Sequence, residues 1–210
     1  MKRAEKILEI LKNTYPHAKC ALDHENVFQL LVATVLSAQS TDKNINKLTK
    51  KLFQYVKSAE DIHKMDQEKL EKMIYSAGFY RQKAKNLKLL SEKIVKEHKN
   101  QVPKKMEKLI KLNGVARKTA NIVLETGYNV TDGIAVDTHV KRISKLLNLT
   151  KNQNPNKIEQ DLCKTFSRKD WGKINHLMVT HGRNICIANR PKCDKCPLFE
   201  LCPSRKIFES

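Results

Sequence analysis

The sequence predicts an all-α fold, and three observations support this prediction. Apolar residues recur at helical spacing along most of the chain, as they do at Ile7, Leu8 and Leu11. Capping residues precede several of these segments, such as the pair Asn154–Pro155. No segment shows the alternation of apolar and polar residues that a half-buried strand would require, and no internal repeat is visible.

Breaking and capping residues set the limits of the predicted helices. Five helices are expected over residues 2–12, 26–38, 81–98, 106–112 and 171–185. The segment 26–38 is apolar on nearly every face, which indicates a buried helix. One further helix is expected after residues 40–42, with apolar positions as far as Val56, and another between Asp66 and Gly78. Two more are expected, one that starts near Asp137 and one from Asn154 to near Phe166.

The charge of the chain favours a polyanionic partner. The 210 residues include 41 Lys and Arg against 22 Asp and Glu, a formal charge of +19. Such an excess is typical of nucleic-acid binders. Most of the cations are lysines, so a generally lysine-rich proteome would also explain it. Charge therefore favours nucleic acid without establishing it.

The sequence gives no sign of a membrane segment. No stretch approaches the roughly 20 apolar residues of a membrane span, and the N-terminus lacks the long apolar core of a secretory signal. We expect a cytoplasmic protein, associated with the nucleoid through DNA. A monomer is expected, because no long exposed apolar seam stands out. With 40% hydrophobic residues the chain can bury one large core or two small ones.

The stretch from Leu112 to Ala120 is the most informative part of the chain. An apolar helix end is followed by a tight turn at Gly114 and a second helix that opens with Arg117 and Lys118. The first N–H groups of a helix have no intrahelical acceptor, and the helix dipole adds partial positive charge there. The turn could therefore bind a DNA phosphate. An ordinary connection between two helices is the alternative.

Four of the six cysteines lie close together near the C-terminus. Cys186, Cys193, Cys196 and Cys202 follow the spacing C-x6-C-x2-C-x5-C. Four thiolates in a short stretch of a cytoplasmic protein indicate a metal site. Chemistry alone leaves both zinc and a [4Fe–4S] cluster open. The other two cysteines, Cys20 and Cys163, are expected to be buried thiols.

The chain resembles the endonuclease III family of helix–hairpin–helix DNA glycosylases. The resemblance rests on the hairpin, the cysteine spacing, the segment Leu36–Gln39 and the segment Val136–His139. The resemblance implies a six-helix domain over residues 21–131. It implies a second helical domain formed by residues 1–20 and 132–210, with the DNA in a groove between the two. It also implies a [4Fe–4S] cluster on the four cysteines. The family usually has proline at the position of Asn113 and a second glycine at that of Ala116.

The resemblance assigns two catalytic residues. Lys118, four residues after Gly114, corresponds to the Schiff-base nucleophile, and Asp137 corresponds to the second catalytic residue. A lysine attacks only as a neutral amine, which burial or nearby positive charge favours. The alternative roles are a phosphate contact for Lys118 and a helix N-cap for Asp137.

The resemblance also implies contacts with DNA. Gln39 and Phe79 would fill the gap left by a flipped nucleotide, although the family more often has leucine at the position of Phe79. The simpler alternatives are a polar helix end and a core aromatic. Arg190 and Lys192 lie where the family has a loop that contacts phosphates. The simpler alternative is a pair of solvated surface charges. The further expected DNA contacts are Gly114, Val115, Ala116, Arg117 and His139.

The implied function is base excision repair. The enzyme would remove oxidised pyrimidines of the thymine glycol type from duplex DNA and cut the strand 3′ to the abasic site. Adenine-mismatch glycosylases lack the lysine and carry a further C-terminal domain, which argues against them here. A thymine–guanine glycosylase of the same superfamily and a catalytically silent DNA-binding iron–sulfur protein remain alternatives.

Overall fold

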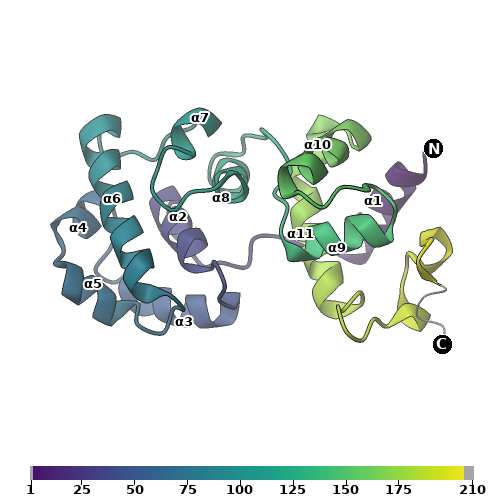
Figure 1. The fold of residues 1–210 in the computed structure, drawn as a ribbon, viewed down its shortest axis with the longest axis horizontal. Helices are drawn as coiled ribbons and strands as arrows, with labels where there is room; N and C mark the ends of the chain where they lie inside the picture. Colours follow the sequence, from purple (N-terminus) through teal and green to yellow (C-terminus); the bar gives the residue numbers. More distant parts are fainter. Residues whose placement is uncertain (1, 206–210) are drawn as a thin grey trace. The chain divides into compact units, whose positions relative to one another are not determined.

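A computed structural model describes residues 2–205, and every regular element in that range is helical (Figure 1). The all-α class predicted from the sequence is confirmed for this part of the chain. The chain divides into two compact units, Ala21–Asp132 and Met1–Cys20 with Gly133–Ser210. We call them the hairpin unit and the cysteine unit. This division lies within one residue of the domain limits expected from the sequence.

The hairpin unit is built around α2, which is buried on all sides. Every residue from Phe28 to Leu36 is buried, as the apolar pattern of this segment predicted. The longest helix of the unit is α6, which packs against α2, α4 and α5. In chain order the unit contains α2 (Val27–Leu36), α3 (Asp42–Leu52), α4 (Ala59–Lys64), α5 (Gln67–Met73), α6 (Tyr80–His98), α7 (Met106–Leu109), α8 (Arg117–Ile122) and the π-helical turn η1 (Val123–Gly127).

Three expected helix limits in this unit were wrong, and one helix was missed. The helix expected to reach Val56 ends at Leu52, and Val56 is buried in the turn that follows. The short helix α4 was not predicted. Gly78 does not stop α5, which ends at Met73, and Gly78 lies instead in the turn before α6. Apolar side chains in a turn can have the same spacing as those of a helix when they point into the core. The spacing of apolar residues therefore did not show where these helices end. The first hairpin helix, α7, is also shorter than expected and ends at Leu109.

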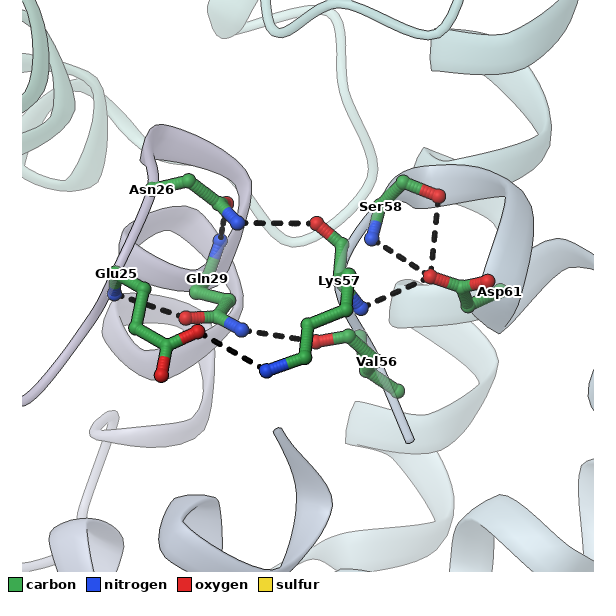
Figure 2. Close-up of polar contacts among 7 residues, drawn as sticks. All are labelled: Glu25, Asn26, Gln29, Val56, Lys57, Ser58 and Asp61. Carbon is green, nitrogen blue, oxygen red and sulfur yellow. Dashed lines mark hydrogen bonds and ion pairs between the residues drawn. The ribbon is translucent and has the colours of Figure 1, made fainter. Parts of the chain in front are cut away.

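A polar network around the buried Gln29 joins the start of α2 to the connection between α3 and α4 (Figure 2). Gln29 is fully buried, and its Nε2 donates to the Val56 carbonyl at 3.0 Å. Its Oε1 accepts from the Glu25 N–H at 2.9 Å. Asn26 caps α2 by accepting from the Gln29 N–H and donates to the Lys57 carbonyl at 3.0 Å. These bonds satisfy polar groups that burial would otherwise destabilise.

Asp61 completes this network and should make the free energy of unfolding depend on pH in the acid range. Its Oδ2 accepts from the N–H groups of Lys57 and Ser58 and from the Ser58 hydroxyl. Burial alone would raise the pKa of Asp61, but these hydrogen bonds hold it below its ordinary value. The stabilisation is therefore present above the unfolded pKa of about 3.9 and is lost as pH falls through the lower folded pKa.

We expect Asp61→Asn to lower the free energy of unfolding by about 1 kcal/mol at pH 7, as for a lost helix cap. Urea unfolding at pH 7 and at a pH below the folded pKa measures the effect. The difference from the parent should shrink at the lower pH, because Asp61 of the parent is then protonated too. An equal difference at both pH values would contradict this account.

The cysteine unit combines both ends of the chain. Within it, α1 packs against α11, and α11 packs against α9 (Figure 1). Arg3 of α1 donates through Nη2 to the carbonyls of Leu147 and Leu201, each at 2.7 Å. The unit contains α1 (Arg3–Thr14), α9 (Thr138–Leu146), α10 (Pro155–Thr165), α11 (Trp171–Asn184) and the 3₁₀ turns η2 (Arg168–Asp170), η3 (Cys193–Lys195) and η4 (Phe199–Leu201).

The core of this unit includes Ile7, Leu8 and Leu11, the apolar positions predicted for the first helix. It is formed by Ile7, Leu8, Leu11, Ile134, Val136, Val140, Ile143, Leu147, Ile158, Leu162, Phe166, Ile174, Leu177, Met178 and Leu198. Asn154 caps α10 and Pro155 is its first residue, as the sequence predicted. Across residues 2–205, no helix combines the length and the apolar character that crossing a bilayer requires.

Candidate functional site

The hairpin is a tight turn between α7 and α8. Gly114 adopts φ 76°, in the left-handed region that favours glycine. The N–H of Val115 closes the turn by donating to the Leu112 carbonyl at 3.1 Å. Ala116 then precedes α8 with φ −88°, the negative value expected for it, and no side chain caps the helix start. The first turn of α8 is therefore open to an external acceptor.

Gly114 also allows the hairpin to approach α6. A Cβ at this position would lie 3.0 Å from Nδ2 of Asn86. Together with the positive φ, this contact leaves no unstrained place for a larger residue.

We expect Gly114→Ala to lower the free energy of unfolding by about 1–2 kcal/mol and to weaken DNA binding. Thermal unfolding and a DNA titration measure the two effects. Gly78→Ala is the matched control for stability, because its Cβ would meet its nearest atom at an ordinary 3.7 Å. A Gly114→Ala protein as stable as Gly78→Ala would contradict this reading of the turn.

The side chains that follow the turn differ in exposure. Lys118 is exposed in the first turn of α8, so its amine is accessible to a macromolecular substrate. Arg117 is half-buried and lies 3.8 Å from Asp132 in an ion pair whose partners are each 41% exposed. Such a pair contributes little to stability and leaves the guanidinium able to exchange partners.

Val115, expected among the DNA contacts, has a buried side chain. The side chain is 6% exposed and packs in the core, and its N–H is used within the turn. The side chain of Val115 therefore fixes the turn to the hairpin unit, and only its backbone lies in the hairpin.

Two loops of the hairpin unit carry the predicted wedge residues. We call residues 37–41 the Gln39 loop and residues 74–79 the Phe79 loop. Gln39 is exposed with φ 56°, and Phe79 is 71% exposed with φ 58°. The alternative of a core aromatic at Phe79 is therefore wrong. A Cβ on Gly78 would lie 3.7 Å from the Gln39 carbonyl oxygen, so the two loops lie against each other.

Asp137 belongs to the cysteine unit, whereas Lys118 belongs to the hairpin unit. Asp137 is the N-cap of α9, and its Oδ1 accepts from the Val140 N–H at 2.8 Å. This bond confirms the capping role expected as one of the two alternatives. It engages one oxygen of the half-buried carboxylate, so a cap can also act as a base through the other oxygen.

Helix α9 packs closely on α11. A Cβ at Gly182 would lie 2.5 Å from Nδ1 of His139, so only glycine allows this approach. Arg142 donates through Nη2 to the Cys186 carbonyl at 2.5 Å and lies 3.4 Å from Nδ1 of His139. The helix that Asp137 caps is thus tied to the chain segment where the cysteine cluster begins. His139, expected as a DNA contact, is half-buried at this junction.

The four terminal cysteines line one cavity of about 30 Å³. Most of its other lining residues are apolar, among them Ile143, Leu146 and Phe199. Burial raises the pKa of Cys196 to about 11 and also raises that of Cys186. Cys196 Sγ lies 3.7 Å from Nε2 of His181. Burial, followed by the nearby Arg142 charge, lowers the pKa of His181 to about 4.

Over residues 2–205, no three Cys, His, Asp or Glu side chains come close enough to hold one metal ion. Arg190 and Lys192, expected as phosphate contacts, are exposed on the loop between Cys186 and Cys193. The Lys192 N–H donates to the Ile185 carbonyl at 3.0 Å and closes this loop.

Sequence reasoning missed two residues that shape these sites. Lys83 is a buried lysine beneath the Gln39 loop, and Arg142 links α9 to Cys186. In the sequence both belong to helices with several Lys and Arg residues, and nothing in the spacing separates them from their neighbours. Only their position against carbonyl groups from distant segments reveals them.

Known proteins resemble the whole chain. Residues 32–168 match the family described as HhH-GPD superfamily base excision DNA repair protein. A Synechocystis protein named endonuclease III is 48% identical, covering 96% of this chain and 92% of the relative. Endonuclease III of Bacillus subtilis is 41% identical with the same coverage.

Solved structures agree with these relatives. A non-covalent endonuclease III–DNA complex matches with a TM-score of 0.92 and 39% identity, covering 99% of this chain and 98% of that one. A trapped endonuclease III–DNA covalent intermediate matches with a TM-score of 0.93 and 38% identity, covering 99% of each chain. The chain therefore belongs to the endonuclease III family of base excision repair enzymes, within the HhH-GPD superfamily.

Proposed function

We propose that this enzyme removes oxidised pyrimidines of the thymine glycol type from duplex DNA and then cleaves the strand 3′ to the abasic site. The observation that carries the proposal is the position of Lys118. Its exposed amine stands four residues after Gly114, in the first turn of the second hairpin helix. A solved relative of 38% identity is a trapped covalent intermediate with DNA, which is the species that an attacking amine would form.

In the proposed reaction the lone pair of the Lys118 amine forms a bond to C1′ of the damaged nucleotide. The bond between C1′ and the base breaks, and its electron pair leaves with the base, which gains a proton. Opening of the sugar ring gives an imine. Loss of a proton from C2′ then expels the 3′ phosphate, and this β-elimination cuts the strand.

Asp137 is proposed to assist in two ways. Its carboxylate takes the proton that the attacking amine must lose. Its negative charge also stabilises the positive charge that builds on the sugar as the base departs. The cap bond to Val140 holds the side chain in a fixed rotamer, which favours both roles because preorganised groups need not rearrange during reaction.

The other proposed roles concern DNA binding. Gln39 and Phe79 fill the gap left by the flipped nucleotide, and an aromatic ring can stack on the exposed bases. The backbone from Gly114 to Ala116 and the side chain of Arg117 approach a phosphate. The remaining proposed phosphate contacts are His139, Arg190 and Lys192.

Binding should depend strongly on salt. If about 5–8 phosphates are neutralised, log K should fall with log salt at a slope of about −5 to −7. Fluorescence anisotropy of a lesion duplex across salt concentrations measures this slope, and Arg117→Gln should reduce it by about 1. A slope near zero for the parent protein would show that the charge of +19 is not used on DNA.

We also propose that Cys186, Cys193, Cys196 and Cys202 hold a [4Fe–4S] cluster. All four line one cavity, and four cysteine thiolates are the usual ligand set of a [4Fe–4S] cluster. When bound, the cluster supplies four strong iron–thiolate bonds. Its role here is to fix the loop that carries Arg190 and Lys192.

Metal analysis distinguishes the two metals. About four iron atoms and four sulfides per chain are expected, whereas one zinc per chain would contradict the cluster. Cys196→Ser should lose the iron. Cys163→Ser is the matched control, because Cys163 is half-buried outside the cavity lining and should retain it.

Single-turnover excision assays test the activity itself. Duplexes carry a thymine glycol, a thymine opposite guanine, or an adenine mismatch. Cleavage confined to the first substrate supports the proposal, and base release from either mismatch would favour the corresponding alternative. Binding without reaction on any of them would favour the silent DNA-binding protein. An enzyme of this kind would work in the cytoplasm at the nucleoid, as a monomer.

A further inference from the structure

Lys83 is a buried lysine in the first turns of α6. It is 6% exposed, although lysines are rarely this buried without partners. Its Nζ donates to the Leu36 carbonyl at 2.8 Å and to the Ala38 carbonyl at 2.7 Å. The Ser40 hydroxyl lies 3.5 Å from the same nitrogen. Burial lowers the pKa of Lys83, because it removes water that would solvate the ammonium group.

The oxygens that Lys83 contacts belong to the end of α2 and to the Gln39 loop. The last carbonyls of a helix have no intrahelical donor, and a cation there also interacts favourably with the helix dipole. Leu36 is the last residue of α2, and Ala38 immediately precedes Gln39. Lys83 thus fixes the two carbonyls that flank the start of the turn in which Gln39 adopts a positive φ.

The same residue is bonded to the Phe79 loop. The Lys83 N–H donates to the Phe79 carbonyl at 3.0 Å, in the first turn that follows this left-handed residue. Another hydrogen bond holds the Phe79 loop, because Asn44 Nδ2 at the start of α3 donates to the Ser76 carbonyl at 2.9 Å. Lys83 therefore joins both loops through one side chain and one backbone group.

We propose that Lys83 is a positioning residue that holds the Gln39 and Phe79 loops as one rigid wedge, so that both side chains enter the duplex together. This inference rests on the proposed function, in which Gln39 and Phe79 fill the gap left by the flipped nucleotide. Both wedge residues occupy a backbone conformation that non-glycine residues rarely adopt. Without the ammonium group, the end of α2 loses its donors and the Gln39 turn relaxes.

The consequence is specific to substrates that must be unstacked. A base inside a duplex has to be extruded, and the wedge stabilises the extruded state. An abasic site in a single strand has no base to extrude and no partner strand to hold apart. Loss of Lys83 should therefore slow reaction in the duplex and spare reaction on the single strand.

The test compares Lys83→Met with a matched variant in the same helix. Lys88 also donates through Nζ to three carbonyls, those of Ile62, His63 and Met65 at the end of α4. Lys88→Met removes an equivalent set of bonds away from the two loops. Both variants should lose similar thermal stability, and this serves as the measure of a purely structural effect.

Single-turnover rates are measured on a thymine glycol duplex and on a single-stranded abasic oligonucleotide. We expect Lys83→Met to slow the duplex reaction at least about tenfold, a change of about 1.4 kcal/mol in the barrier, and to leave the single-strand reaction within about twofold. Lys88→Met should leave both within about twofold. Lys83→Arg should restore most of the duplex rate, because a guanidinium can donate to the same carbonyls.

A 2-aminopurine opposite the lesion reports unstacking directly. Its fluorescence should rise on binding of the parent protein and of Lys88→Met, and much less with Lys83→Met. If Lys83→Met does not fold, Lys83→Gln provides the same comparison. Equal losses on both substrates, or a duplex loss that Lys88→Met reproduces, would overturn the inference. A parent protein that cleaves neither substrate would instead refute the proposed function, and the fluorescence signal would still decide the role of Lys83.

Discussion

Replacing Lys118 with glutamine is expected to abolish strand cleavage at abasic sites, lowering the single-turnover rate by about 10³-fold or more. Removal of a nucleophile eliminates the covalent route, and losses of this size or larger are typical. Glutamine keeps much of the length of the side chain but cannot form an imine. Quantification of cleaved strand on a duplex with one abasic site measures the effect.

The fold should be unaffected, because Lys118 is exposed and contributes nothing to the core. DNA affinity should fall only a few-fold, because the substitution removes one cation that could contact a phosphate. Arg117→Gln is the matched variant at the adjacent position, and it should weaken binding while preserving the rate at saturating enzyme. Undiminished cleavage by Lys118→Gln, or loss of cleavage in Arg117→Gln at saturation, would refute the assignment.

Replacing Asp137 with asparagine should separate its chemical role from its structural one. Asparagine caps a helix about as well as aspartate, so the bond to the Val140 N–H should persist and the unfolding midpoint should change little. The amide cannot accept a proton or stabilise the charge on the sugar. We expect the rate of base excision to fall about 10²- to 10⁴-fold.

Asp137→Ala completes the comparison. It should lose the same activity and, in addition, about 1 kcal/mol of unfolding free energy through the lost cap. Thermal unfolding and single-turnover excision on the same preparations provide both readouts. If Asp137→Asn retained the parental rate while Asp137→Ala lost both rate and stability, Asp137 would be only a cap.

Local patterns predicted the parts of the fold that depend on local chemistry. The apolar segment around α2 could only be a buried helix, and Asn154–Pro155 identified the start of α10 because few dipeptides fit that position. The hairpin was predictable for the same reason, since a glycine with positive φ is required between two helices that turn so tightly. Asp137 as an N-cap also followed from its position before Thr138.

What the sequence could not predict depends on contacts between distant segments. Val56 has helical spacing but lies in a turn, where the carbonyl that Gln29 binds keeps it in the core. Val115 follows the hairpin glycine but is buried, because the turn rests on the core of the hairpin unit. The sequence does not distinguish Lys83 from the other lysines. Only the fold places the carbonyls of Leu36 and Ala38 beside its amine.

The most direct test of the central claim is to locate the covalent bond. The enzyme is mixed with a duplex carrying one thymine glycol, borohydride is added to reduce any imine, and the trapped adduct is digested and mapped by mass spectrometry. The account predicts a single modified residue, Lys118. An adduct on another lysine or on the N-terminal amine would contradict it, as would base release with no adduct, since that result would indicate direct attack by water.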